Sequence, residues 1–311
     1  MLELGIIILN YNTRELLRNC LRSVLENQGD FSCQVCVVDN ASQDGSADMV
    51  ARVFPQVHLI RSPVNGGFSY GNNLGLRAFG FEDSAPRAGN LPLASLEHPA
   101  CVLLLNPDTV VPPGTLSGLL AFMDARPEAG IVGPKLLLMD GSLDLACRRG
   151  FPTPEVSLWR MIGLSKLFPH SPRFGRYNMT FLDPDQVAEV DAVVGACMLL
   201  RAAAIEQVGL LDEAFFMYGE DLDWAKRIKD VGWKVYYNPQ VIVHHVKRAA
   251  SRHSARAQIE FNRAMRIFYT KHYQAHTSWW LDKLVMAGIG LRGRWERFRQ
   301  AWRRQQAREI A

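Results

Sequence analysis

The sequence predicts an α/β fold in which a mostly parallel central sheet is flanked by helices. One observation is a set of short, wholly apolar runs of strand length, such as residues 4–9 and 101–105, typical of strands buried on both faces of a parallel sheet. A second is that segments with the 3.6-residue apolar period of a helix follow these runs. Alternating strands and helices favour right-handed parallel α/β units.

The first sixty residues contain two such units. The strand at residues 4–9 precedes a helix, and the pair Asn12 and Glu15 predicts a capping box at its start. The apolar positions of that helix are Leu16, Leu17, Cys20, Leu21, Val24 and Leu25. The second unit has a strand at residues 35–38, a polar loop at 39–42 and a helix with Met49 and Val50 on its buried side.

Polar loops follow both strands, at residues 10–12 and 39–42. Ligands of open α/β sheets bind outside the carboxyl ends of the strands, so these loops are candidate binding elements. A carboxylate after the second strand, here Asp39, commonly accepts hydrogen bonds from a ribose hydroxyl or a base edge. No GxGxxG motif follows the first strand, which disfavours a dinucleotide site.

The stretch at residues 65–75 is rich in glycine and predicts a loop that leads into a helix. It is either a simple turn or a loop whose backbone approaches a phosphate or a sugar. Residues 82–100 contain three prolines and Gly89 and predict a surface loop.

The apolar run at residues 101–105 ends in Asn106, Pro107 and Asp108. A carboxylate at this end of a strand is well placed to bind a hard divalent cation together with diphosphate oxygens, although the same residues also form ordinary turns. Pro112 and Pro113 then predict the start of a helix that runs to about residue 125.

Residues 212–245 concentrate acidic, aromatic and histidine side chains. Glu220, Asp221 and Asp223 open a predicted helix that ends at Gly232, where the helix dipole stabilises carboxylates as anions. Its apolar face is formed by Leu222, Ala225, Ile228 and Val231. Strands are predicted at 234–237 and 241–243, and the two histidines after them, at 244 and 245, point to opposite faces of the sheet. The alternative is a solvated helix start and an ordinary strand end.

Six segments in this order resemble the inverting family-2 glycosyltransferases of the GT-A fold, which have a Rossmann-like sheet, and most closely their bacterial rhamnosyltransferase-like members. The segments are IILNYN at residues 7–12, VVDNAS at 37–42, NGGF at 65–68, NPD at 106–108, GAC at 195–197 and GEDLD at 219–223. The resemblance implies a nucleotide-sugar donor, Mg²⁺ or Mn²⁺, and single-displacement hexosyl transfer to an acceptor hydroxyl.

The resemblance also implies roles for individual residues. Asp221 would be the general base, with Glu220 beside it. Asp108 would be the metal carboxylate, completed by one of His244 and His245, of which His245 is preferred. Asn106 stands where the family's metal motif has its first carboxylate, which leaves one ionised ligand. The residues of the donor site would be Asn10, Tyr11, Asn12, Asp39, Asn40, Asn65, Gly66, Gly67, Phe68, Asn72 and Asn106. The acceptor side would be shaped by Asp191, Gly195 and Ala196.

Residues 140–190 are the least regular stretch, rich in proline, arginine and aromatic residues. The segment either covers the acceptor cleft as a lid or is a long excursion packed on the core. Arg148 and Arg149 are candidate phosphate contacts.

The length of 311 residues and the 48% hydrophobic content predict one or two globular domains. We expect a catalytic domain at residues 1–250, with a donor half to about residue 110 and an acceptor half from 111, and a helical extension at 251–311. The six cysteines fit reduced thiols, and a redox or zinc role for the Cys33–Cys36 pair is disfavoured because residues three apart in a strand face opposite sides.

The N-terminus lacks the pattern of a secretory signal and no apolar run approaches the length of a membrane span, so we expect a cytoplasmic protein. Residues 292–311 hold seven Arg and two Glu around the aromatic stripe of Trp295, Phe298 and Trp302. That pattern suits an amphipathic helix on the inner face of an anionic plasma membrane. A helix packed on a partner subunit, as in a homodimer, is the alternative.

The leading hypothesis is therefore a metal-dependent inverting glycosyltransferase. It would move a sugar, with rhamnose one candidate, from a dTDP- or UDP-sugar to a glycolipid or polysaccharide acceptor of the cell envelope, and no nucleic-acid partner is expected. The alternatives are a sugar nucleotidyltransferase, which should carry a basic phosphate loop after its first strand, and a catalytically silent sugar-binding or scaffold protein.

Overall fold

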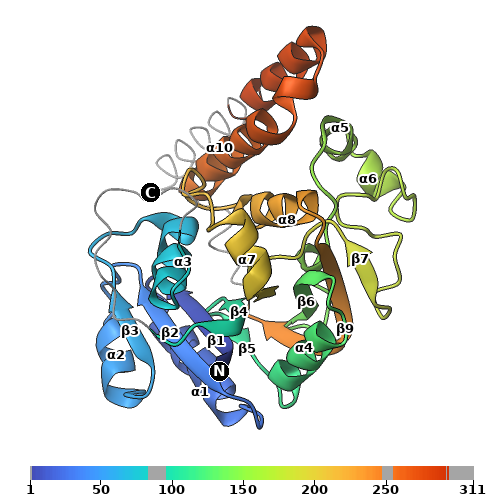
Figure 1. The fold of residues 1–311 in the computed structure, drawn as a ribbon. Coiled ribbons are helices and arrows are strands. Elements are labelled where there is room, and N and C mark those ends of the chain that lie inside the picture. The colour runs from blue at the N-terminus through green and yellow to red at the C-terminus, as the bar shows by residue number, and fades with distance from the viewer. Residues whose placement is uncertain (1, 83–95, 247–254, 292, 294–311) are drawn as a thin grey trace, which may run out of the picture.

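The computed structural model describes residues 2–82, 96–246, 255–291 and 293. Within these residues, nine strands form one sheet with the order β3-β2-β1-β4-β8-β6-β9-β5, and β7 pairs with β9 (Figure 1). The fold is a mixed α/β sheet with helices packed around it, as the sequence predicts.

The first half of the sheet is parallel. It consists of β1 (Leu2–Asn10), α1 (Arg14–Glu26), β2 (Cys33–Asp39), α2 (Ser46–Val53), β3 (His58–Arg61), α3 (Gly67–Ala78) and β4 (Pro99–Leu105). β1 pairs in parallel with both β2 and β4, and β2 pairs in parallel with β3. The carboxyl ends of these strands therefore meet at one edge. Residues 83–95 of the predicted surface loop lie outside the described residues, and the end of that prediction is wrong because β4 already begins at Pro99.

The second half is mixed. It contains β5 (Thr109–Val110), α4 (Thr115–Asp124), β6 (Ala129–Leu138), η1 (Leu145–Cys147), α5 (Pro154–Met161), α6 (Leu164–Leu167), β7 (Ala188–Val190), β8 (Cys197–Arg201), α7 (Ala202–Val208), α8 (Glu220–Asp230) and β9 (Lys234–His245). β8 runs antiparallel to β4 and β6, whereas β9 is parallel to β6 and antiparallel to β5 and β7. The two strands predicted at 234–237 and 241–243 are one strand, whose register with β6 shifts between Pro134 and Lys135.

The capping box predicted from Asn12 and Glu15 is wrong. Asn12 adopts a positive φ of 53°, and its side-chain oxygen accepts a hydrogen bond from the backbone N–H of Gln43 at 2.7 Å instead. The helix N-terminus is completed from the neighbouring loop, because the backbone N–H of Arg14 donates to Asp44 at 2.8 Å.

Most of the glycine-rich stretch is helix, since α3 begins at Gly67. A Cβ atom on Gly71 would lie 2.3 Å from Leu9, and one on Gly75 would lie 2.7 Å from Ile7. These two glycines, one helical turn apart, therefore let α3 pack directly on β1. The stretch is a close helix-sheet contact more than a ligand loop, and only residues 65 and 66 precede the helix.

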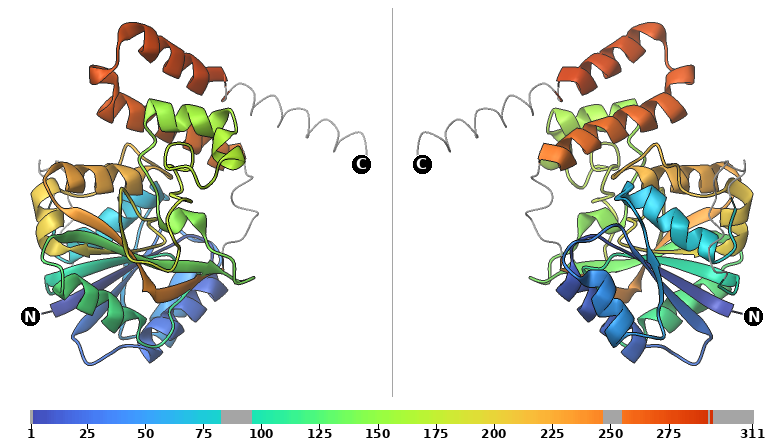
Figure 2. Two further views of the ribbon diagram at one scale, coloured as in Figure 1. Left: turned by 90° about the vertical axis from the view of Figure 1, so that its right-hand side faces the viewer. Right: turned by 90° about the vertical axis from the view of Figure 1, so that its left-hand side faces the viewer.

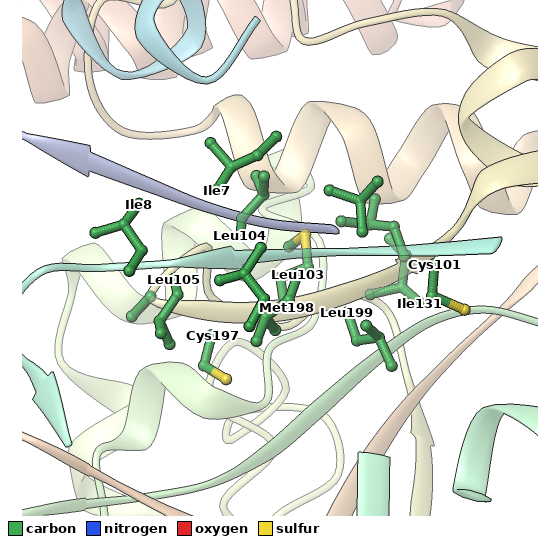
Figure 3. Close-up of a cluster of buried hydrophobic side chains, with 14 of the residues drawn as sticks. Ile7, Ile8, Cys101, Leu103, Leu104, Leu105, Ile131, Cys197, Met198 and Leu199 are labelled. Carbon is green, nitrogen blue, oxygen red and sulfur yellow. The ribbon is translucent and has the colours of Figure 1, made fainter. Parts of the chain in front are cut away.

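The core lies on both faces of the central strands. Figure 3 shows Ile7 of β1, Leu104 of β4 and Met198 of β8 in one cluster, and all three side chains are buried. Fully burying one such side chain contributes roughly 1.5–3 kcal/mol, so this cluster fixes the strands that carry the polar loops. The apolar face predicted for α8 is also buried, except Val231, which follows the helix and is exposed.

The C-terminal helices stand at one end of the molecule, beside α5 (Figure 2). α10 (Ala255–His272) packs on the body through Phe268, which is 3% exposed, so the chain after residue 255 begins with a docked helix. The short turn η2 (Gln274–His276) leads to a further helix at residues 279–291. Apart from residue 293, the predicted amphipathic tail at 292–311 lies outside the described residues.

No helix in the described part of the chain is long and apolar enough to cross a bilayer. The six cysteines are free thiols, as expected from their spacing. The expected boundary at residue 250 stays a prediction, and α10 on its far side makes buried contacts with the body.

Candidate functional site

The loops after β1 and β2 form one buried polar network. Asn10 is fully buried, and its side-chain amide donates to Asp39 at 3.0 Å and to Ser42 at 3.1 Å. The other carboxylate oxygen of Asp39 accepts from the backbone N–H of Ser42 at 3.0 Å. Thr13 donates to Asn10 at 2.6 Å. Satisfied networks of this kind are rigid, so the two loops hold Asp39 in a fixed position at the sheet edge.

Two donor-site candidates lie toward solvent beside this network. The side chain of Tyr11 is 47% exposed. Asn12 is exposed as well, and its backbone N–H donates to Ser42 at 2.9 Å. Tyr11 is thus accessible to a ligand, whereas Asn12 is held by the second loop.

Asn40 ties the loop after β2 to the start of α3. Its amide donates to Asn65 at 3.0 Å and to the carbonyl of Gly67 at 3.2 Å, and its oxygen accepts from the backbone N–H of Gly66 at 3.1 Å. The side chain of Asn40 therefore uses both its donor and its acceptor groups on residues 65–67. Four of the predicted donor-site residues form one connected unit.

Phe68 connects that unit to the second half of the chain. Its backbone N–H donates to the carbonyl of Phe216 at 2.6 Å, and its own carbonyl accepts from the buried Asn72 at 2.9 Å. A Cβ atom on Gly195 would lie 3.1 Å from the ring of Phe68 and 3.8 Å from Asp221. Gly195 therefore separates Phe68 from the candidate base by little more than the thickness of a backbone.

Asp108 and His245 come together where β5 pairs with the end of β9. The backbone N–H of Val246 donates to the carbonyl of Asp108 at 2.8 Å, which aligns the two segments. Nε2 of His245 lies 3.3 Å from Asp108, and Nδ1 lies 3.0 Å from Asp144. Burial alone would lower the pKa of His245, but the hydrogen bonds and charges of Asp108 and Asp144 outweigh it and raise the pKa.

The other histidine is directed elsewhere. His244 lines a shallow surface depression with Arg22, Asn27 and Pro112, whereas His245 is buried beside Asp108. Strand alternation explains the difference, because neighbouring residues face opposite sides of the sheet. The structure thus brings His245 to Asp108 and leaves His244 on the far side.

The pair Asp108 and His245 has the chemistry of a partial metal site. A carboxylate oxygen and an imidazole nitrogen suit Mn²⁺, and a carboxylate with donor phosphates is a common Mg²⁺ arrangement. Among residues 2–82, 96–246, 255–291 and 293, no cluster of three or more His, Cys, Asp or Glu side chains could hold a metal ion. Two protein ligands therefore fit a cation whose other ligands come from a diphosphate. Asn106 is held beside this pair by its backbone N–H, which donates to the carbonyl of Ala196 at 2.9 Å.

Asp221 lies at the N-terminus of α8 in a buried ion pair. Its Oδ2 atom lies 2.5 Å from the guanidinium of Arg149 and 3.2 Å from the backbone N–H of Gly195. Oδ1 accepts from the backbone N–H of Leu222 at 2.8 Å. The same nitrogen of Arg149 also donates to the carbonyl of Val193 at 2.8 Å, so the guanidinium is held by the backbone as well as by Asp221.

Glu220 has a different environment although it is adjacent. It is buried, and its Oε2 atom has no hydrogen-bond partner among the described residues. Burial, and then the charge of Asp221, raise the pKa of Glu220 to about 8, so it carries its proton at neutral pH. The two neighbouring carboxyl groups thus have different surroundings. Asp221 is paired with Arg149, whereas the protonated Glu220 is able to donate a hydrogen bond.

Asp223 has no part in that pair. It is fully buried between Arg227 at 2.9 Å, His272 at 2.7 Å and Lys271 at 2.9 Å. Arg227 lies one turn along the same helix, whereas the other two partners come from α10. Burial would raise the pKa of Asp223, but His272, Arg227 and Lys271 lower it to about 2.

On the expected acceptor side, Gly195 and Ala196 lie in the site and Asp191 is held by cations. Asp191 lies 3.1 Å from both Lys229 and Arg176 and accepts from the backbone N–H of Phe151 at 3.2 Å. Its contacts tie the irregular segment to α8. An acceptor role for Asp191 therefore stays a prediction.

The structure adds two contacts that the sequence analysis missed. Asp144 touches His245, and Arg149 touches Asp221 rather than standing free for a phosphate. Arg148 donates to the carbonyl of Asp183 at 2.9 Å, so it too is engaged by the protein. The irregular segment thus contributes side chains to the site itself. Its sequence carries no local signal for these contacts, because their partners lie far along the chain.

Known proteins resemble this chain over most of its length. Residues 3–266 match a family model described as "Glycosyltransferase like family 2". The N-acetylglucosaminyl-diphospho-decaprenol L-rhamnosyltransferase of Mycobacterium tuberculosis is 28% identical over 247 residues, covering 79% of this chain and 76% of that protein. The low-salt glycan biosynthesis hexosyltransferase Agl10 of Haloferax volcanii is 30% identical, covering 73% of this chain and 62% of that protein.

Solved structures share the fold. The mannosyltransferase PcManGT from Pyrobaculum calidifontis, solved with GDP-Man and Mn²⁺, superposes with a TM-score of 0.55 at 16% identity, covering 94% of this chain and 71% of that one. S. aureus TarS superposes with a TM-score of 0.53 at 17% identity, covering 94% of this chain and 43% of that one. These neighbours have the GT-A fold.

Proposed function

The chain belongs to glycosyltransferase family 2 and is a glycosyltransferase, and we propose that it moves a sugar with inversion from a nucleotide-diphosphate donor to an acceptor hydroxyl, with the help of Mg²⁺ or Mn²⁺. The observation that carries the proposal is the junction at Gly195 and Ala196. There the backbone N–H of Gly195 binds Asp221, the carbonyl of Ala196 binds Asn106, and Phe68 packs against Gly195. The candidate base Asp221, the loop that carries Asn106, and Phe68 of the donor side thus lie next to one another.

The donor's nucleoside would bind at the network of Asn10 and Asp39. The Asp39 carboxylate is suited to accept hydrogen bonds from ribose hydroxyls or a base edge, and Asn10 and Ser42 hold it in place. Tyr11 is exposed beside it and is able to stack on the base. We expect a dTDP- or UDP-sugar, with rhamnose as the candidate sugar because of the relative from M. tuberculosis.

Asp108 and His245 would hold the cation, together with diphosphate oxygens of the donor. A divalent ion bound there supplies positive charge for the departing diphosphate. The PcManGT structure, which was solved with Mn²⁺, supports a metal for this fold.

Asp221 would take the proton of the acceptor hydroxyl while that oxygen attacks the anomeric carbon. The bond from the anomeric carbon to the diphosphate breaks in the same step, so the enzyme needs one base and no nucleophile. Arg149 fixes the orientation of the carboxylate, and the protonated Glu220 is able to orient the acceptor.

The acceptor would be a glycolipid or a polysaccharide of the cell envelope, which the name of the M. tuberculosis relative supports. A membrane surface would then lie near the C-terminal helices. Trp279 is 73% exposed there, and the side chains of Trp280 and Leu284 are exposed as well. At the same end, Ile162, which directly follows α5, and Leu167 of α6 are also exposed.

Peripheral attachment at the cytoplasmic face is tested by flotation with anionic liposomes. Deleting residues 292–311 should abolish flotation and leave donor hydrolysis intact, because the tail carries the excess of arginine. If the truncated protein floats like the full chain, the partner-helix alternative is favoured.

A donor panel tests the function. The full chain is incubated with UDP-, dTDP- and GDP-sugars with Mn²⁺, with Mg²⁺ or with EDTA, and hydrolysis and transfer are recorded. We expect one donor class to be consumed only with metal, and Asp108→Ala to abolish that consumption. Donor consumption that is equal with Mn²⁺ and with EDTA would contradict the metal role, and no consumption of any donor would favour the silent alternative.

A further inference from the structure

A third side chain contacts the Asp108–His245 pair from the irregular segment. Asp144 is 4% exposed, and one of its carboxylate oxygens lies 3.0 Å from Nδ1 of His245. The opposite nitrogen of the same ring, Nε2, lies 3.3 Å from Asp108. Asp108, the imidazole and Asp144 therefore form a row with the ring in the middle.

The row has the arrangement that orients histidine ligands of metals. A neutral imidazole has one N–H and one free lone pair, and the partner of the N–H decides which nitrogen keeps the lone pair. A carboxylate at Nδ1 accepts a hydrogen bond, so it holds the proton on Nδ1 and leaves Nε2 for a cation. Such outer carboxylates also fix the plane of the ring and raise its basicity as a ligand.

We propose that Asp144 is a positioning residue, which orients His245 and fixes its tautomer so that Nε2 faces a divalent cation beside Asp108. The inference rests on the proposed metal-dependent function and deepens it. It assigns a role in the site to the irregular segment, which neither the sequence pattern nor the comparisons assign.

Asp144 also has a structural task that a test must separate. Its other carboxylate oxygen accepts from the backbone N–H of Ala146 at 3.1 Å and caps η1, which leads on to Arg149. A substitution that removed both contacts would disturb the turn and the ion pair of Arg149 with Asp221. The informative substitution keeps the cap and removes the contact with His245.

Asp144→Ser meets this requirement. Serine is as good a helix cap as aspartate, but its hydroxyl is one bond shorter and does not reach the imidazole. The matched control is Asp140→Ser, four residues earlier in the same segment. Asp140 is exposed and bonds only locally, to the backbone and hydroxyl of Ser142 at 2.9 and 2.6 Å.

The experiment measures Mn²⁺ binding by the full chain with UDP and, separately, with dTDP. Electron paramagnetic resonance of free Mn²⁺ gives the affinity, and spin-echo modulation from an imidazole nitrogen reports histidine ligation. We expect Asp144→Ser to bind Mn²⁺ about 10- to 100-fold more weakly and to lose most of the nitrogen modulation. Asp140→Ser should bind like the wild type, and His245→Ala should lack the modulation altogether.

The outcomes separate this inference from the function on which it rests. If the wild type binds Mn²⁺ without nitrogen modulation, or does not bind it, both the metal site and the role of Asp144 fail. If the wild type shows the modulation and folded Asp144→Ser shows it unchanged at equal affinity, the role of Asp144 alone fails. Asp144→Thr, whose hydroxyl also caps η1 without reaching the imidazole, serves as the second variant and should show the same loss if the serine variant does not fold.

Discussion

Two carboxylates of α8, only two positions apart, have opposite surroundings. Asp221 faces the junction at Gly195 with a single cation, Arg149. Asp223 is enclosed by three basic side chains, two of which come from α10. Because successive helical residues turn by about 100°, one short helix presents these acids to different parts of the molecule.

The comparison separates the candidate site around Asp221 from a structural joint, the cluster of Asp223 with Arg227, Lys271 and His272 that ties α8 to α10. Among the described residues, the side chain of Asp223 contacts three basic side chains, and its depressed pKa of about 2 means that folding favours its charged form. Beside Asp221, in contrast, Glu220 keeps an unpaired carboxyl oxygen and a raised pKa. Unsatisfied buried polar groups are rare in proteins and concentrate at functional sites. Helix α8 thus stabilises the fold on one side, and we propose that it carries the chemistry on the other.

Removing the charge of the structural joint should have the largest effect on stability. Asp223→Asn leaves Arg227, Lys271 and His272 without their common carboxylate partner and should lower the free energy of unfolding by about 3–5 kcal/mol in urea at pH 7. The control is Asp230→Asn, whose exposed pair with Lys226 should be worth less than about 1 kcal/mol. Equal losses in both variants would contradict the distinction between the two faces.

The pH dependence of that loss has a definite sign. The pKa of Asp223 is lower in the folded protein than in the unfolded chain, so its contribution is present above about pH 4 and disappears as the pH falls toward 2. The difference between wild type and Asp223→Asn should therefore shrink in acid. A difference that grows below pH 4 would show that another group is responsible.

Glu220→Gln should have an intermediate effect on stability, and it should stabilise the protein where Asp223→Asn destabilises it. The pKa of Glu220 is about 8 in the folded protein and near 4.5 when unfolded, so the folded state binds the extra proton between those values and stability falls as the pH rises through them. Glutamine cannot ionise, so the stability of the variant relative to wild type should rise by on the order of a few kcal/mol between pH 5 and pH 9. Urea unfolding at pH 5 and pH 9 measures the free energy of unfolding of both proteins. A difference between variant and wild type that is the same at both pH values would contradict the raised pKa of Glu220.

Lys271→Met should have the smallest effect. Lys271 is partly exposed and contacts Asp212 at 2.6 Å and Asp223 at 2.9 Å. Solvent screens such a pair, so we expect a loss of roughly 0.2–1 kcal/mol, smaller still in high salt. The salt dependence of the urea midpoint measures this contribution. A loss as large as that of Asp223→Asn would mean that Lys271 alone carries the joint.

The first half of the chain could be predicted from sequence because its structure depends on local patterns. The apolar run at 4–9 and the helical period around Met49 correspond to β1 and α2, since buried strands and amphipathic helices need those residues wherever they lie. Asn12 shows the limit of local patterns. It looks like a helix cap, but a loop thirty residues away supplies a better partner for its side chain.

The site itself depends on contacts across long stretches of chain. Arg149 and Asp221 are separated by 72 residues, and Asp144 and His245 by 101. No periodicity records such a contact, so the irregular segment gave no sign that two of its side chains reach the site. The resemblance supplied Asp108, His245 and Asp221, because it rests on motifs rather than on periodicity.

The central claim is that Asp221 carries the chemistry, and one comparison tests it most directly. Turnover and donor affinity are measured for folded Asp221→Asn, with Asp223→Asn as the reference, per molecule of folded protein. A general base contributes about 10²- to 10⁴-fold in rate, so Asp221→Asn should lose that much turnover while its donor dissociation constant stays close to that of the wild type. Asp223→Asn should keep the turnover of the wild type. If folded Asp221→Asn retains most of the wild-type turnover, the base lies elsewhere and the division between the two faces of α8 is wrong.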